Sequence, residues 1–299
     1  MPNTGFRISA ILGTSFLVLF SGLAKNMDAV APRTAEDVRL CVMTVNLRYA
    51  SPTPPNSWPE RRPVMSRCIR KFAPDIIGTQ EGLYGQLKDI STDLADYTWI
   101  GLGRDGGSRG EFMAVFYRSE RLEPMAFDHF WLSDTPEVVG STTWGNSNRR
   151  MVTWVRFRDR STGREFYFWN THLDHQIELA RQKGAALIVE RVRRLQTDLP
   201  VLLAGDFNCA AGQSRSYEIL LKEGGFADTW SLALLHVNEK LNTFHGFQAP
   251  MEAGVRIDWI LARGAVSVEK TEIVTCSENG QRPSDHFPVV AWLTLAAAR

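Results

Sequence analysis

Short apolar runs alternate with longer amphipathic stretches from residue 39 onward, and no linker, low-complexity tract or tandem repeat separates them. The short runs carry strand patterns, and turn residues between Ser161 and Gly163 join two of them. Predicted strands cover 39–46, 73–81, 97–103, 111–117, 150–159, 164–174, 199–208, 256–263, 266–275 and 286–295. We therefore predict one domain with many short strands.

The longer stretches have the apolar spacing of helices. In 58–72 the apolar residues lie at positions 64, 65, 68, 69 and 72, which form one stripe along a helix. Further helices are predicted at 83–94, at 176–195 and at 216–224. Helices interspersed among strands of mixed direction favour an α/β sandwich over a strictly alternating parallel sheet.

The first residues differ from the rest. Residues 8–24 contain no charge and follow Arg7, which is typical of a signal peptide. We predict a signal peptide over 1–31, with cleavage after Ala24 or Ala31, and a catalytic domain over 38–298. The alternative is an uncleaved anchor or a buried helix, although the run is slightly shorter than the ~20 residues of a membrane span. Cleavage predicts export to the periplasm or the extracellular space, with no stable membrane insertion afterwards.

The charge balance changes the range of possible functions. Lysine and arginine total 34 against 33 acidic residues, so the chain lacks the basic excess that proteins coating nucleic acid usually have. A hydrophobic content of 44% provides ample apolar surface for one large domain. We expect a monomer.

The four cysteines are widely spaced and form no C-x-x-C pair, which excludes a zinc ribbon or redox motif evident from spacing. Export would permit disulfides. Because a core of this size does not need them, we interpret the cysteines as buried free thiols.

Polar residues stand where the apolar runs stop. They are Asn46, Glu81, Glu111, Asn170, His172, Asp206, Asn208, Asp258, Asp285 and His286. Any single one of them could be a turn former or a helix cap. Together, polar groups at several strand ends predict a site at one rim of a sheet.

The residue types at these positions narrow the chemistry. Several carboxylates and an asparagine amide, without a cysteine–histidine cluster, form an oxygen-ligand site that suits Mg²⁺, or Mn²⁺, better than zinc. The histidines can exchange protons near neutral pH. This combination predicts hydrolysis of a phosphoester.

The motifs NLRY, PDIIGTQE, GEFMAVFY, NTHLDH, GDFN, RIDWIL and SDHFPV occur in this order along the chain. In this order they resemble the endonuclease/exonuclease/phosphatase superfamily, which has the DNase I-like fold and includes deoxyribonucleases, sphingomyelinases, inositol-polyphosphate 5-phosphatases and deadenylases. NSWPERR, residues 56–62, is similar to the deadenylase-like branch and its exported members. The resemblance implies a four-layer α/β/β/α sandwich of two packed mixed sheets flanked by helices, with a metal at one end.

The resemblance also implies residue roles. Glu81 would be the main metal ligand, with Asn46 and Asp285 completing the site directly or through water. Asp206 would orient or deprotonate the attacking water, a role for which His286 is the alternative. The remaining implied roles are phosphate contacts by Asn208, His172 and His286, orientation of His172 by Glu111, and orientation of His286 by Asp258.

Several residues have weaker assignments. Arg150 and Arg104 are predicted to bind the substrate phosphate, and a surface charge is the alternative for Arg150. His175 is either a substrate contact or a capping or solvent-facing residue. Cys209 is interpreted as packing. Asn170 is expected to support the sheet rim. Trp58, Trp131 and Trp144 fall in predicted loops, where they could stack a sugar or a base, although core packing is the alternative.

These features favour an exported phosphatase or phosphodiesterase that acts on a small or carbohydrate-linked phosphoester. A nuclease, either deadenylase-like or an endonuclease, is the alternative, so nucleic acid remains a possible partner. A catalytically dead binding module is a remote alternative, because every expected position is filled. A sphingomyelinase-like enzyme is disfavoured, because no apolar hairpin or basic amphipathic helix for lipid docking is evident.

Overall fold

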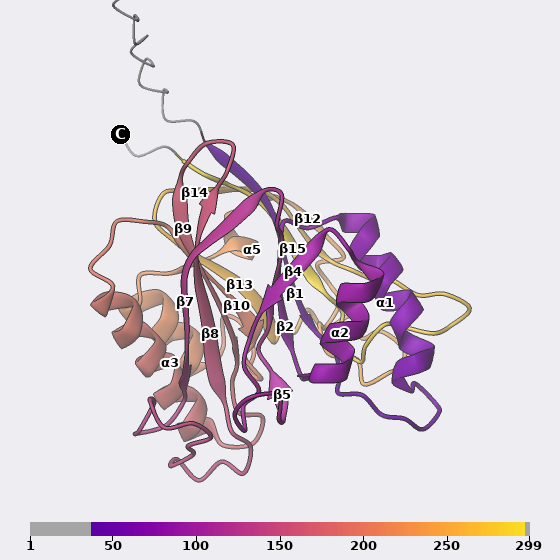
Figure 1. Ribbon diagram of the computed structural model, residues 1–299. Helices are drawn as coiled ribbons and strands as arrows, with labels where there is room; N and C mark the ends of the chain where they lie inside the picture. Colours follow the sequence, from indigo (N-terminus) through magenta and orange to yellow (C-terminus); the bar gives the residue numbers. More distant parts are fainter. Residues whose placement is uncertain (1–36, 297–299) are drawn as a thin grey trace, which may run out of the picture. The chain divides into compact units, whose positions relative to one another are not determined.

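The computed structural model describes residues 37–296, so the predicted signal peptide and its cleavage sites lie outside the described residues. Two mixed sheets form its centre (Figure 1). The first sheet has the order β12 (Ala233–Val237), β14 (Val266–Ile273), β15 (Val289–Leu295), β1 (Val38–Asn46), β2 (Ile76–Gln80), β6 (Val115–Arg118) and β4 (Tyr97–Ile100). The second has the order β11 (Ala227–Asp228), β13 (Asp258–Arg263), β10 (Val201–Asp206), β9 (Glu165–His172), β8 (Met151–Asp159) and β7 (Leu122–Trp131). A small pair joins β3 (Gly82–Leu83) and β5 (Glu111–Phe112).

Helices cover the outer faces of both sheets (Figure 1). The helical segments are α1 (Trp58–Phe72), α2 (Tyr84–Asp93), α3 (Glu178–Arg194), α4 (Arg215–Glu218), the π-helical turn η1 (Ile219–Glu223) and α5 (Thr229–Leu232). Apolar side chains of α1 and α2 pack on the first sheet, and those of α3, α4 and η1 pack on the second. No helix among the described residues is long and apolar enough to cross a membrane. The predicted four-layer α/β/β/α sandwich is confirmed.

The core between the two sheets comes from the inward faces of the strands. Val42 and Ile76 of the first sheet share one buried cluster with Phe166, Phe168 and Leu202 of the second. Near the rim, polar Asn170 replaces this apolar packing: its Nδ2 donates to the carbonyls of Thr79 (2.8 Å) and Ala114 (2.9 Å) on the opposite sheet. Asn170 therefore supports the rim, as expected, by joining the two sheets.

The strand predictions missed one long strand. β7 (Leu122–Trp131) lies at the edge of the second sheet, and its register shifts between Pro124 and Ala126. Proline is tolerated on an edge strand because no neighbour needs its missing N–H, and this interruption hides the strand pattern. The predicted strand 111–117 is divided into β5 and β6. β5 pairs with β3, whereas β6 pairs with β2 and β4.

The three tryptophans are buried rather than placed for stacking. Trp58 begins α1, Trp131 ends β7, and Trp144 packs beside α3. Their indole N–H groups donate to Asp89, to the carbonyl of Arg104 and to Asp134. The loop assignment was wrong for Trp58 and Trp131, and none of the three lines the site cavity.

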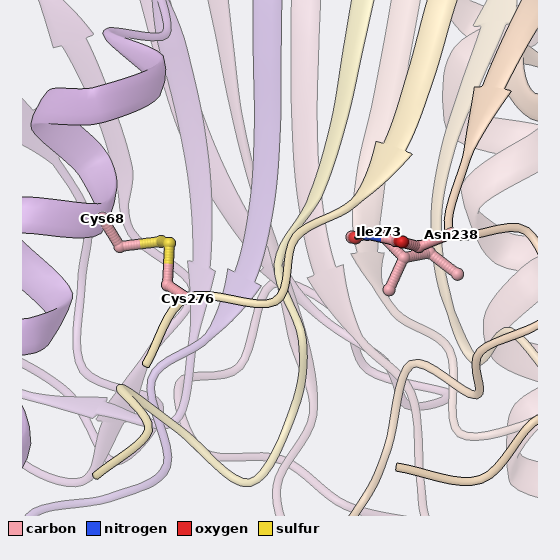
Figure 2. Close-up of a disulfide and its surroundings, with 4 residues drawn as sticks. All are labelled: Cys68, Asn238, Ile273 and Cys276. Carbon is pink, nitrogen blue, oxygen red and sulfur yellow. Dashed lines mark hydrogen bonds between the residues drawn. A yellow bond between two sulfur atoms is a disulfide. The ribbon is translucent and has the colours of Figure 1, made fainter. Parts of the chain in front are cut away.

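The interpretation of all four cysteines as free thiols was wrong. Cys68 on α1 and Cys276 after β14 form a disulfide across 208 residues of sequence (Figure 2). The fold brings their Cα atoms to 5.9 Å, which linear spacing could not indicate. Cys41 and Cys209 remain free thiols, and burial raises the pKa of Cys41 to about 12 and that of Cys209 to about 11. Cys209 packs beside the outer helices, as interpreted.

Candidate active site

Strand register brings the predicted polar residues together at one rim. β9 and β10 run parallel with His172 opposite Asp206, and β10 pairs antiparallel with β13, which places Asp258 opposite Asp206 on its other side. The first sheet contributes Asn46 from the end of β1, whose Nδ2 donates to Asp206 Oδ2 and to Glu81 Oε1, both at 3.0 Å. One asparagine thus connects the two sheets at the site.

Asp206 is a buried acid beside another acid. Its carboxylate also accepts from the backbone N–H of Asn208 at 3.0 Å. Burial raises the pKa of Asp206, and the neighbouring Asp258 raises it further. Asp206 therefore takes up a proton more readily in the folded protein than it would in water.

His286 lies between the two acids. Its Nδ1 is 3.0 Å from Asp258 Oδ2, and its Nε2 is 3.8 Å from Asp206 Oδ2. Burial lowers the pKa of His286, but the carboxylates of Asp258 and Asp206 outweigh burial and raise it. The structure places Asp258 where the predicted orientation of His286 requires it, and the catalytic roles of both remain a prediction.

The predicted pairing of Glu111 with His172 is wrong. Glu111 accepts a hydrogen bond from Arg104 Nη1 at 2.6 Å. Burial together with Arg150 lowers the pKa of His172 well below its usual range, so the ring is neutral. A carboxylate binds a charged guanidinium more strongly than a neutral imidazole. His172 Nδ1 has no hydrogen-bond partner among the described residues, while its Nε2 lies 2.9 Å from Asn208 Nδ2.

The predicted metal ligands lie together around one arginine. Glu81 directly follows β2, and the guanidinium of Arg48 is 3.9 Å from Glu81 Oε2 and 3.6 Å from Asp285 Oδ2. Burial raises the pKa of Asp285, and the charge of Glu81 adds to this effect. The side-chain oxygen of Asn46 accepts from the backbone N–H of Arg48 at 2.8 Å.

Asp206, Asp258 and His286 form another group that could hold a metal, since their ligand atoms lie within 4.8 Å of one another. This group differs from the predicted set of Asn46, Glu81 and Asp285. The carboxylates and amide oxygen of the predicted set are the ligands that a hard cation such as Mg²⁺ prefers, whereas the second set offers two carboxylates and an imidazole nitrogen.

A cavity of about 360 Å³ opens over these residues. Its lining consists of Arg48, Tyr49, Glu81, Arg104, Glu111, Asn148, Arg150, His172, His175, Asp206, Asn208, Phe244, Ile257, Asp285 and His286. The lining holds three arginines against four carboxylates. His286, whose pKa is raised, adds a fourth positive group, so these charges balance. A divalent cation would supply the positive surplus that favours a phosphate.

Both predicted substrate-binding arginines line the cavity. Arg150 is 4% exposed, which excludes the surface-charge alternative. Its Nη2 lies 3.1 Å from Nδ1 of His175, which is exposed at the cavity, and its Nε pairs with Oδ2 of the buried Asp174 at 3.8 Å. Arg104 is held by Glu111.

Sequence reasoning missed five lining residues: Arg48, Tyr49, Asn148, Phe244 and Ile257. Arg48 and Tyr49 follow Asn46 in the motif NLRY, so their position after a strand end was an available signal. Phe244 is half-exposed, and its ring centroid is 4.9 Å from that of His286. No periodic pattern marked Phe244 or Asn148, because both belong to loops.

Comparison with known proteins identifies relatives along most of the chain. A crystal structure of an endonuclease/exonuclease/phosphatase family protein from Bacteroides thetaiotaomicron is 33% identical, with a TM-score of 0.83 over 88% of this chain and 97% of that chain. The mannosyl-6-phosphatase of Bacteroides thetaiotaomicron is also 33% identical, with a TM-score of 0.79 over 85% of this chain and 99% of that chain. An uncharacterized protein of Acanthamoeba polyphaga mimivirus is 29% identical over 160 residues, which are 50% of this chain and 59% of that protein.

The sequence pattern that defines the Endonuclease/Exonuclease/phosphatase family matches residues 43–286 of the chain. This span contains every predicted site residue. Members of this family hydrolyse phosphoesters. The chain belongs to the endonuclease/exonuclease/phosphatase family.

Proposed function

We propose that the protein is a divalent-metal-dependent phosphatase or phosphodiesterase that acts on a small or carbohydrate-linked phosphoester. The observation that carries the proposal is the cavity, in which Asp206, His172, Asn208 and His286 meet beside arginines. Its volume is at the lower end of small-molecule sites, which are ~300–1,000 Å³. This size suits a sugar phosphate better than a polynucleotide.

In this proposal the phosphoryl group lies against the rim formed by β9 and β10. Asn208 and His172 line the cavity there, and Asn208 Nδ2 contacts His172 Nε2 and donates to the carbonyl of Leu173. A phosphate oxygen would replace one of these two contacts of Asn208, and Asp206 would orient or deprotonate the attacking water. Asp258 holds the ring of His286, whose Nε2 points toward Asp206. Arg150, held beside Asp174 and His175, presents its guanidinium at the cavity, where we propose that it binds the ester's remaining anionic or hydroxyl oxygens.

Glu81 and Asp285, with Asn46 beside them, are the residues proposed to hold Mg²⁺ or Mn²⁺. When bound, the ion would polarise a phosphoryl oxygen and neutralise developing charge. The lining charges balance without an ion, so a bound cation would supply the positive surplus that favours a phosphate, which supports this assignment.

The substrate class draws support from one relative. The mannosyl-6-phosphatase shares 33% identity and the same fold over 99% of its chain. We therefore propose a phosphorylated sugar as the first substrate to test. The disulfide between Cys68 and Cys276 supports the proposed export, because such bonds persist in oxidising compartments.

The decisive test is a substrate panel of hexose phosphates that includes mannose 6-phosphate, a simple phosphodiester, RNA and single-stranded DNA. Each is assayed with Mg²⁺, with Mn²⁺ and with excess chelator. We expect turnover of a small ester that chelator abolishes. Glu81→Gln should lose this turnover, whereas Glu190→Gln, at an exposed position of α3, should keep it. Activity confined to nucleic acid and falling steeply with salt would instead support the nuclease. Folded protein with no activity on any ester would support the binding module.

A further inference from the structure

Arg61 of α1 is fully buried and binds no carboxylate within ion-pair distance among the described residues. Its guanidinium instead donates five hydrogen bonds of 2.6–3.1 Å to backbone carbonyls. The acceptors are the carbonyls of Leu47, Arg48, Tyr49, Asn56 and Pro283. Burial lowers the pKa of Arg61 to about 10, so the group remains charged at neutral pH. A buried charge that binds only carbonyls has a structural task in the segments that it joins.

These carbonyls belong to segments that carry site residues. Residues 47–49 directly follow Asn46 and include Arg48 and Tyr49, which line the cavity. Pro283 lies two residues before Asp285. Arg61 therefore holds the backbone next to Asn46 and Asp285, which are two of the three proposed metal ligands.

α1 holds the segment before Asp285 at further points. Cys68 is bonded to Cys276, and Arg67 forms an ion pair with Glu278. Gln281 Nε2 donates to the side chain of Asn56, just before the helix, at 3.0 Å. Figure 2 shows the disulfide joining Cys68 of the helix to Cys276 of the segment that follows β14.

We propose that α1 is a clamp for the active site and that Arg61 is its positioning residue, which holds Asn46 and Asp285 in the arrangement that binds the divalent ion. This inference rests on the proposed metal-dependent function. It goes further by assigning metal affinity to a residue that touches neither the ion nor the substrate. Residues behind metal ligands typically change metal affinity about 10–100-fold when mutated.

The test compares Arg61→Lys with Arg62→Lys. Both variants keep the positive charge and alter adjacent positions of α1, but Arg62 faces α2, where it pairs with Asp89 and Asp93. Lysine has three donors in place of the fork that reaches five carbonyls. Because charge is conserved, any change in cation affinity reports geometry. The binding of Mn²⁺ alone is measured by titration calorimetry, together with kcat and KM at increasing metal concentration.

We expect about tenfold or greater weakening of Mn²⁺ binding in Arg61→Lys, with Arg62→Lys equal to wild type. The kcat of Arg61→Lys should recover at high metal concentration while KM for the substrate stays unchanged, which a general loss of folding would not produce. Equal Mn²⁺ affinity in the two variants would overturn the clamp and leave the proposed function intact. Absence of binding to the wild type would overturn both.

A second variant keeps the inference testable if Arg61→Lys does not fold. Cys68→Ser combined with Cys276→Ser removes a different link between α1 and the segment before Asp285. Weaker Mn²⁺ binding by the folded double variant supports the clamp. Unchanged affinity contradicts it.

Discussion

Two buried acids lie at opposite ends of the second sheet and have opposite electrostatics, because Asp206 ends β10 and Asp159 ends β8, which runs the other way. At the Arg150 end, Asp206 stands next to Asp258, and its pKa is raised. At the far end, Asp159 accepts from the backbone N–H groups of Ser161 (3.1 Å) and Thr162 (2.9 Å) and from Arg121 Nε (3.2 Å). Burial acts to raise the pKa of Asp159, but these donors outweigh burial and lower it.

The difference separates an acid that stabilises the fold from an acid retained for chemistry. Asp159 has donors that favour its charged form, so its ionisation contributes to stability. Burial and the neighbouring Asp258 both oppose the ionisation of Asp206, so its charged form lowers stability. At the same end lies His172 Nδ1, a buried nitrogen without a hydrogen-bond partner among the described residues. Strained electrostatics of this kind concentrate at functional sites.

The strongest test of this comparison is Asp206→Asn. Loss of one preorganised catalytic group is worth ~3 kcal/mol, so we expect kcat to fall about a hundredfold or more. The change removes a buried charge and its repulsion from Asp258, which offsets the loss of one acceptor for Asn46, so the melting temperature should change little. Steady-state kinetics and calorimetry measure the two effects, and retained kcat in the folded variant would remove Asp206 from the mechanism.

Asp159→Ala should show the reverse pattern. Removal of this acid leaves Arg121 and the turn at 161–162 without their acceptor, which we expect to destabilise the protein by ~2–3 kcal/mol. For a domain of this size the melting temperature should fall by about 5–10 °C. The kcat of the variant below its melting transition should equal that of wild type. A loss of kcat below the melting transition would contradict the purely structural role of Asp159.

Arg150→Lys tests whether the arginine at the Asp206 end binds the substrate. Lysine keeps the charge but loses the planar fork, so we expect KM for a phosphoester to rise about tenfold, or ~1.4 kcal/mol. The matched variant is Arg156→Lys, since Arg156 lies on β8, which begins directly after Arg150, and pairs with Glu165 instead of lining the cavity. An equal KM in both variants would show that Arg150 does not contact the substrate.

The smallest expected effect is a pH dependence at the structural end. The pKa of Asp159 is lower in the folded chain than its ordinary value of 3.8. Its contribution is therefore complete above that value and is lost as pH falls through the lower, folded-state pKa. Urea unfolding of wild type and Asp159→Asn should show a stability difference that is largest near neutrality and shrinks below about pH 4. A constant difference across this range would contradict the assignment.

Local patterns predicted much of the fold. The apolar stripe at 64, 65, 68, 69 and 72 corresponds to α1 (Trp58–Phe72), and the apolar run before Asp206 corresponds to β10. These predictions succeed because a helix or a buried strand repeats its environment every few residues. β7 escaped because Pro124 and the register shift interrupt that repeat at a sheet edge.

The candidate site was predicted as a set of residues but not as a set of contacts. Asp206, His172 and Asp258 meet because their strands are adjacent and in register. The sequence indicated that these residues lie close together, because all of them stand at strand ends. The pairing of Glu111 with Arg104 instead of His172 depends on which groups approach most closely, and no local pattern encodes that.

What the sequence determined by itself was the chemistry available and the ordering of strands and helices, since residue type and periodicity act over a few neighbouring positions. Only the tertiary structure decided the disulfide across 208 residues, the burial of Trp131 and Trp144, and the carbonyl contacts of Arg61. Each of these depends on distances between segments far apart in the chain. Such distances are set by the packing of sheets and helices against one another, which no single segment specifies.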